Sequence, residues 1–315
     1  MINTKNPNLA GILSLCLGVL VFSTQDAILK SVSHDYAVSE AIAIRCTVAL
    51  PILLAMVHTE AGIKRLVSPN FKAMVLRGVI MLIAYTAYFM SLPALPLAEA
   101  IALFFCVPIL ITIMSGPLLG EAIGAGTWVA VIAGFIGVFI IVQPGTSLFE
   151  PAALLSLISA ATYAFAMILA RKLGVAEPAT VMSFYQNAVY LVGAFLIAGL
   201  FAALGIHEAG HPSLDFLVRS WVVPSVNDFW LMAACGVIAA LGMSLLTHAY
   251  RTAQANIVTV FEYTGMVWTP LWGFLFFNEI PKWTTVAGTV LIIAAGLFAM
   301  RSATQTPLRD ADAST

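Results

Sequence analysis

Residues 255–300 read ANIVTVFEYTGMVWTPLWGFLFFNEIPKWTTVAGTVLIIAAGLFAM and form two long apolar runs that meet at a short polar break, Asn278-Glu279. Each run is long enough to cross the hydrocarbon core of a bilayer as a helix, which takes about 20 residues. The first run contains one acid, Glu262, beside Tyr263. Because a charge is costly in lipid, we expect Glu262 to face a protein interior or a water-filled cavity.

The composition of the whole chain agrees with this stretch. The 315 residues are 61% hydrophobic and 9% charged, and the mean hydropathy is +0.99. Soluble domains carry about 25% charged residues, so an ordinary globular protein is excluded. The net charge of −1 also excludes a nucleic-acid binder that works through bulk positive charge. The four cysteines show neither metal-ligand spacing nor a secreted disulfide framework, so we expect no metal and no cofactor.

Ten apolar spans follow from the hydropathy pattern, separated by breaks that contain Gly, Pro, Asn or charged residues. We therefore expect an all-α polytopic membrane protein with ten transmembrane helices. The spans lie near residues 9–31, 37–57, 73–92, 97–118, 125–143, 151–171, 179–205, 228–250, 254–277 and 282–301. One loop, residues 205–227, is long.

The two halves of the chain resemble each other. Residues 117–142 and residues 274–300 each show an apolar helix, an acid in the break (Glu121 or Glu279), a Trp soon afterwards and a second, glycine-bearing apolar helix. Five spans per half make the second copy inverted in the membrane, which is typical of transporters with a site near the midplane. Close helix packing is expected at the glycines of these helices, namely Gly134, Gly137, Gly288 and Gly296.

These repeats divide the chain into segments. We expect an N-terminal tail at 1–8, a first repeat at 9–145, a second repeat at 146–301 and a disordered tail at 302–315. Lys and Arg are enriched in cytoplasmic loops, and ten of them fall on one side of this arrangement against four on the other. Both termini, and hence both tails, are therefore expected in the cytoplasm of a bacterium, with the protein in the inner membrane as a monomer or homodimer.

Three stretches resemble the EamA family of the drug/metabolite transporter superfamily. They are LPALPLAEAIALFFCVPILITIMSGPLLGE at 92–121, GFIGVFIIVQPG at 134–145 and FEYTGMVWTPLWGFLFFNE at 261–279. The last is similar to a subgroup that includes riboflavin carriers, S-adenosylmethionine carriers and metallophore exporters. The resemblance implies ten spans, a substrate cavity between two halves, alternating access and, in several members, coupling to protons.

Intramembrane polar residues are the first candidates for a site. Asp26 lies four residues before Lys30, so it either lines a cavity or pairs with Lys30 on one helix face. Arg45 either binds a carboxylate or phosphate of the substrate or pairs with Glu40. Glu121 and Glu279 are expected to cap the helices that follow them. The substrate-binding candidates are Gln25, Asp26, Arg45, Tyr88, Tyr185, Gln186, Glu262, Tyr263 and Trp268, with Asp26 and Glu262 as candidates for proton coupling.

One motif indicates a different class of protein. His207-Glu208-Ala209-Gly210-His211 matches H-E-x-x-H, in which a zinc protease places both histidines on one helical face. Gly210 and the following Pro212 oppose such a helix. We therefore expect a secondary transporter and not an enzyme, with a zinc metalloprotease as the alternative. The expected cargo is a small polar metabolite: an organic cation, a zwitterion such as an amino-acid derivative, or an aromatic vitamin-like compound.

Overall fold

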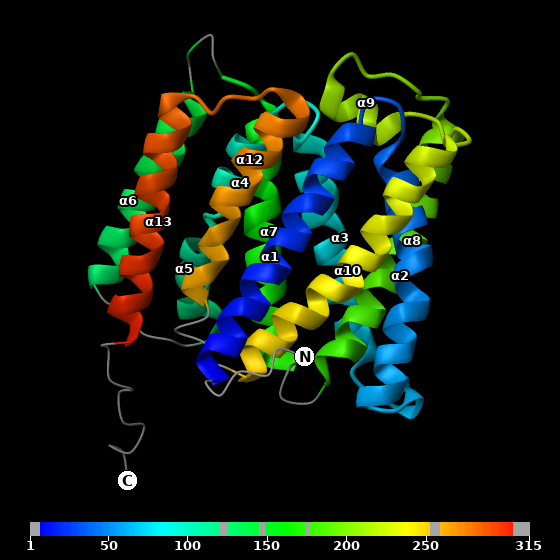
Figure 1. Cartoon of the computed structure of the whole chain (residues 1–315), viewed down its shortest axis with the longest axis horizontal. Coiled ribbons are helices and arrows are strands. Elements are labelled where there is room, and N and C mark those ends of the chain that lie inside the picture. The colour runs from blue at the N-terminus through cyan, green and yellow to red at the C-terminus, as the bar shows by residue number, and fades with distance from the viewer. Residues whose placement is uncertain are drawn as a thin grey trace.

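The computed structural model describes residues 7–119, 125–144, 146, 149–173, 177–252 and 259–304. Its helices cross one bundle in alternating directions (Figure 1). We call the end where α1 begins and α13 ends the termini end, and the opposite end, which carries α9, the α9 end. The helices of the first half are α1 (Pro7–Val32), α2 (Val38–Glu60), α3 (Phe71–Ser91), α4 (Leu97–Phe104), α5 (Val107–Leu119) and α6 (Ala125–Val142), with a 3-10 turn η1 (Ile63–Leu66).

The second half repeats this order. It contains α7 (Ala152–Leu173), α8 (Ala179–Leu204), α10 (Val226–Thr252), a 3-10 segment η2 (Thr259–Thr264), α12 (Gly265–Phe277) and α13 (Trp283–Thr304). The short helix α9 (Pro212–Val218) lies in the long loop at residues 205–227. Among the described residues, six helices are long and apolar enough to cross a membrane, and four shorter apolar helices accompany them. The expected ten-span all-α fold is confirmed.

The fourth and ninth spans both depart from a single uninterrupted α-helix, and they occupy equivalent positions in the two halves. The fourth span was expected as one helix but divides into α4 and α5. Proline at position 108 has no N–H to donate to the carbonyl of Phe104, and Cys106 instead donates to Leu103 at 3.2 Å. The ninth span begins with η2 and continues as α12. Broken helices of this kind commonly form the binding sites of transporters with inverted repeats.

The packing of the helices has the symmetry of an inverted repeat. Exchanging each helix for its counterpart in the other half leaves the main contacts unchanged: α1 packs on α10 and α7 packs on α3, while α6 packs on α13 and α2 packs on α8. At the α6–α13 contact, a Cβ at Gly137 would lie 2.8 Å from the carbonyl oxygen of Gly288. The expectation that glycines allow close packing is therefore confirmed at this crossing.

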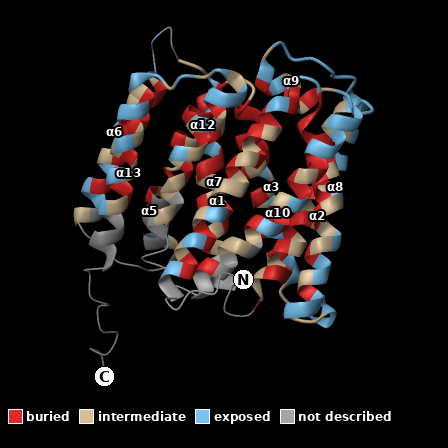
Figure 2. Cartoon of the chain, in the orientation of Figure 1, coloured by how far each residue is buried: buried red, intermediate tan, exposed pale blue. Residues whose placement is uncertain are grey.

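Burial is reversed relative to a soluble protein. Large apolar side chains are exposed on the outer faces of the bundle, as on α6 and α8 (Figure 2). Polar side chains such as Gln25, Arg45, Arg77 and Gln186 are buried inside. A lipid-facing surface cannot satisfy polar groups, so this distribution matches a helix bundle surrounded by hydrocarbon.

Candidate functional site

A cavity of about 800 Å³ lies inside the bundle between the two halves. Its walls come from α1, α2, α3, α4, α5, α7, α8, α10 and α12. The two broken spans contribute Phe104, Phe105 and Val107 from the first half and Gly265 and Thr269 from the second. Small-molecule sites typically measure about 300–1,000 Å³ and are mostly apolar with a few placed polar groups. This cavity has the size and lining of such a site.

One polar cluster lies in the part of the cavity nearer the α9 end. The Tyr88 hydroxyl donates to Asp26 Oδ2 at 3.1 Å, from α3 to α1. Arg45 on α2 donates from Nε to Gln25 Oε1 at 3.0 Å, and its guanidinium lies 6.0 Å from the centre of the Tyr85 ring. Gln25 and Arg45 are buried, and all five residues line the cavity. The cluster therefore offers one carboxylate and one guanidinium to a ligand.

A second polar cluster lies deeper, toward the termini end. Arg77 on α3 donates from a terminal nitrogen to Gln186 Oε1 on α8 at 3.1 Å. Gln186 in turn donates to the Tyr190 hydroxyl at 3.2 Å. Arg77 was not among the site candidates chosen from the sequence. It is 5% exposed and lines the cavity.

The inverted repeat places the two clusters at equivalent depths, measured from opposite ends of the bundle. Arg45 is the eighth residue of α2, which starts at the α9 end. Gln186 is the eighth residue of the counterpart helix α8, which starts at the termini end. Along α3, Arg77 and Tyr88 are eleven residues apart, or about 16 Å of helix rise. The Tyr85 and Tyr190 rings, 5.6 Å apart, lie between the clusters.

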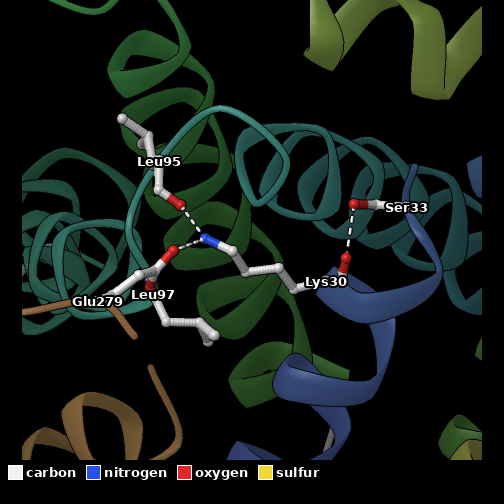
Figure 3. Close-up of polar contacts among 5 residues, drawn as sticks. All are labelled: Lys30, Ser33, Leu95, Leu97 and Glu279. Atoms are coloured by element: carbon white, nitrogen blue, oxygen red, sulfur yellow. Dashed lines mark hydrogen bonds and ion pairs between the residues drawn. The ribbon is translucent and has the colours of Figure 1, made fainter. Parts of the chain in front are cut away.

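A partly buried ion pair lies toward the α9 end of the bundle, one helical turn beyond Asp26 on α1. Lys30 Nζ contacts the Glu279 carboxylate and the Leu95 carbonyl oxygen (Figure 3). The other oxygen of Glu279 accepts from the Leu97 N–H at 2.8 Å. This cluster joins the end of α1, the start of α4 and the loop before α13. It therefore connects the two halves beyond the cavity.

These contacts bear on two alternatives that the sequence left open and correct one expectation. Lys30 pairs with Glu279 and not with Asp26, whose partner is Tyr88. Arg45 does not pair with Glu40, which instead accepts from the Val222 N–H at 3.3 Å. Glu279 caps α4 and not the helix that follows it, while Glu121 lies outside the described residues.

The nine substrate-binding candidates do not all lie together. Gln25, Asp26, Arg45, Tyr88 and Gln186 line the cavity. Tyr185 points away from it and donates to the Leu66 carbonyl at 2.5 Å. Tyr263 packs on Phe105 at 5.4 Å between ring centres. Neither Tyr263 nor Trp268 is among the described residues that line the cavity. The backbone of Glu262 lies in η2, before α12 and not within a continuous helix as expected, and its side chain lies outside the described part.

The H-E-x-x-H segment does not form a zinc-protease helix. His207, Glu208 and His211 precede α9, which begins at Pro212. His207 Nδ1 lies 2.7 Å from Ser220 Oγ, whereas His211 Nε2 lies 3.1 Å from Glu150 Oε1. Within the ranges that the structure describes, no three His, Cys, Asp or Glu side chains are grouped as metal ligands. The protease alternative is not supported.

Sequence reasoning missed several cavity residues. Besides Arg77, they include Ser159 on α7 and Ser183 and Asn187 on α8. Arg77 lies within the span expected at 73–92, where an ionisable residue indicates a functional site by default. That signal was present in the sequence. The serines and Asn187 carry no comparable signal, because small polar residues are tolerated throughout membrane helices.

Comparison with known proteins identifies the family. Residues 9–143 and 150–301 match the model of the EamA-like transporter family. The chain belongs to this family. A solved structure described only as the crystal structure of a protein has the same fold, with a TM-score of 0.61 at 18% identity over 95% of this chain and 99% of the other.

Curated relatives of this EamA-like transporter carry transport names. It is 29% identical to the pseudopaline exporter CntI of Pseudomonas aeruginosa, over 91% of this chain and 94% of the relative. It is 27% identical to the S-adenosylmethionine uptake transporter of Rickettsia prowazekii, over 72% and 71%. It is 30% identical to the riboflavin transporter of Rhizobium johnstonii, over 72% and 69%. The EamA-like chain is thus a multi-pass bacterial membrane protein and a secondary transporter of a small metabolite.

The ion pair at the α9 end yields a stability prediction. Lys30→Met removes the cation and leaves the Glu279 carboxylate, whose side chain is 21% exposed, without its charged partner. Removing one member of a buried pair costs about 3–5 kcal/mol, and we expect a value near the lower limit here because Glu279 is partly hydrated. The melting temperature of the purified protein in detergent should fall by several degrees.

The matched double variant Lys30→Met/Glu279→Gln removes both charges and keeps an acceptor for the Leu97 N–H. Its melting temperature should lie well above that of Lys30→Met and closer to that of the wild type. Equal losses in the single and double variants would contradict a direct Lys30–Glu279 interaction, since only coupled sites depart from additivity.

Proposed function

We propose that this EamA-like transporter carries a zwitterionic metabolite with an apolar or ring-bearing body. Asp26, hydrogen-bonded by Tyr88, accepts the ammonium group, and Arg45, oriented by Gln25, binds the carboxylate. The observation that carries the proposal is the presence of both charges at one level of the same cavity. A guanidinium binds a carboxylate through paired donors, which gives geometric specificity as well as affinity.

The aromatic walls suit the body of such a cargo. Tyr88 and Phe104 have ring centres 5.3 Å apart, and Phe104 and Tyr163 have ring centres 5.2 Å apart. These rings come from α3, α4 and α7, so they surround the cavity from both halves. Aromatic faces accept apolar groups, rings and cations. Of the three cargo types considered from the sequence, the zwitterion uses the acid, the base and the rings together.

The proposed transport cycle is alternating access between the two inverted halves. The cavity lining begins at Ala179, the first residue of α8, at the termini end. Toward the α9 end it stops at Asp26, Arg45 and Tyr88, below the buried Lys30–Glu279 pair. This geometry supports a state that is open toward the termini end. With both termini in the cytoplasm and the protein in the inner membrane, that state is inward-facing, and opening the other side requires the Lys30–Glu279 pair to separate.

The proposed orientation is tested by cysteine labelling in intact cells. Val67 and Val223 are 89% and 97% exposed and lie toward the termini end and the α9 end, respectively. A membrane-impermeant maleimide should label Val223→Cys from outside and Val67→Cys only after the membrane is permeabilised. The wild-type protein, with Cys46, Cys106 and Cys235 buried, serves as the control. The reverse pattern would place both termini outside.

The proposed site is tested by a thermal-shift screen of purified protein against metabolites, because a ligand that binds the folded state stabilises it. The compounds with the largest shifts should be zwitterions. Asp26→Asn keeps the size of the side chain but removes its charge, and it should weaken their binding at least about tenfold, or ~1.4 kcal/mol. Asp35→Asn, at an exposed turn after α1, should leave binding unchanged.

The same variants separate binding from proton coupling, for which Asp26 and Glu262 are the proposed residues. A coupling residue replaced by its amide should still permit exchange of the bound compound across a proteoliposome membrane, but transport should no longer respond to a pH gradient. Glu262→Gln is the companion to Asp26→Asn. If compounds without a carboxylate give the largest shifts, and Asp26→Asn binds them as the wild type does, the proposed site is wrong.

A further inference from the structure

We infer that Arg77 forms a second anion subsite in the cavity, which binds a distal carboxylate of the cargo. This inference rests on the proposed function, because it assumes that the Asp26–Arg45 cluster holds the zwitterionic head of the same molecule. The cargo class that follows is an amino acid derivative with two carboxylates, one at each end of an extended body.

The charges of the side chains that line the cavity do not balance. Among the described residues that line the cavity, Arg45 and Arg77 are the basic side chains and Asp26 is the acidic one. Buried charges in proteins are paired or hydrogen-bonded, because desolvation is costly. One carboxylate cannot neutralise two guanidiniums. A ligand that brings one ammonium and two carboxylates pairs every one of these three side chains.

Hydrogen-bonding capacity around Arg77 is unfilled. In the part of the chain that the structure describes, Arg77 takes part in no ion pair, and its neutral partner is Gln186. Its Nε and the Ser159 Oγ, both buried on the cavity wall, have no hydrogen-bond partner among described residues. A guanidinium presents five N–H donors in a fixed plane. A carboxylate accepts two of them side by side.

The positions of the two guanidiniums suit an extended cargo. Arg45 lies over the Tyr85 ring, and Arg77 is linked through Gln186 to the hydroxyl of Tyr190, the ring that packs on Tyr85. The two guanidiniums therefore bracket one pair of rings, with Arg77 toward the termini end. An extended cargo can place its head at Arg45, its chain along the rings and its distal carboxylate at Arg77.

The test uses two series of L-amino acids matched in chain length. L-2-Aminoadipate, L-2-aminopimelate and L-2-aminosuberate carry a distal carboxylate, and L-norleucine, L-2-aminoheptanoate and L-2-aminooctanoate have a methyl group in its place. Affinities come from thermal-shift titrations of the purified full chain. At one or more lengths, we expect the dicarboxylate to bind about ten- to a hundredfold tighter than its methyl partner, as charged hydrogen bonds allow.

Arg77→Gln should abolish this preference and leave the affinity for the methyl series within about twofold. Arg77→Lys should restore part of the preference, because it keeps the charge but loses the planar fork. Lys72→Gln, which removes an exposed charge from the same helix, should change neither series. A melting temperature of Arg77→Gln close to that of the wild type establishes that the variant is folded.

The outcomes separate the inference from the proposed function. The dicarboxylate preference depends on Arg77, whereas binding of the methyl series depends on Asp26 and Arg45. Loss of the methyl series in Asp26→Asn with no dicarboxylate preference in the wild type would overturn the Arg77 subsite and leave the proposed head site intact. A dicarboxylate preference that persists in Arg77→Gln would also overturn it. An Arg77-dependent preference without any effect of Asp26→Asn would uphold the subsite and refute the head site.

Discussion

Hydrocarbon offers no hydrogen-bond partner to a polar side chain, and the structure of this EamA-like transporter follows from that constraint. Helices pair the backbone N–H and C=O groups internally, and the outer faces of the bundle carry exposed apolar side chains. Among the described residues, Asp26, Arg45 and Arg77 place charge in the cavity, and the Lys30–Glu279 contact lies beyond it. A buried charge without a protein partner is costly, so Arg77 and Asp26 are the groups for which a bound ligand supplies the largest compensation.

The inverted repeat explains why this cavity lies where it does. Each main helix contact between the halves has an equivalent contact in which the halves exchange roles, as is typical of transporters whose inverted repeats move against each other. The fourth span breaks beside the cavity at Phe105-Cys106, and in the ninth span a 3-10 segment changes to the α-helix α12 at Gly265. A break in a helix leaves backbone polar groups without intrahelical partners, which is tolerated where the backbone lines a cavity. The contact of Lys30 with Glu279 and with the start of α4 then holds one arrangement in place.

The fold was predictable from the sequence because its causes are local. Apolar runs of about 20 residues predict spans, and five spans per half predict inversion. The expectation that intramembrane charges mark a site led to Asp26 and Arg45, which line the cavity. The partners of these residues were not predictable in the same way. Lys30 lies 249 positions from Glu279, whereas pairing by helical spacing considers only neighbours three or four residues away.

Arg77 and Glu262 show that the surroundings of a charged residue cannot be predicted from its position in a span alone. Arg77 was not among the candidates chosen from the sequence, but it is buried on α3 and lines the cavity. Glu262 was placed deep in a continuous helix, but a 3-10 segment precedes α12. The 3-10 segment cannot be predicted from a run in which nearly all residues are apolar. Which face a residue presents depends on packing with distant helices, and periodicity is weak in helices that are apolar on all sides.

The central claim is that the cavity between the halves carries a carboxylate-bearing zwitterion through the membrane. Proteoliposomes loaded with a bacterial metabolite extract test it most directly, with mass spectrometry of the compounds that leave. Wild-type protein should release one or a few amino carboxylates faster than liposomes that contain the Asp26→Asn/Arg45→Gln double variant. Release of the same compounds at the same rates from both preparations would contradict the account.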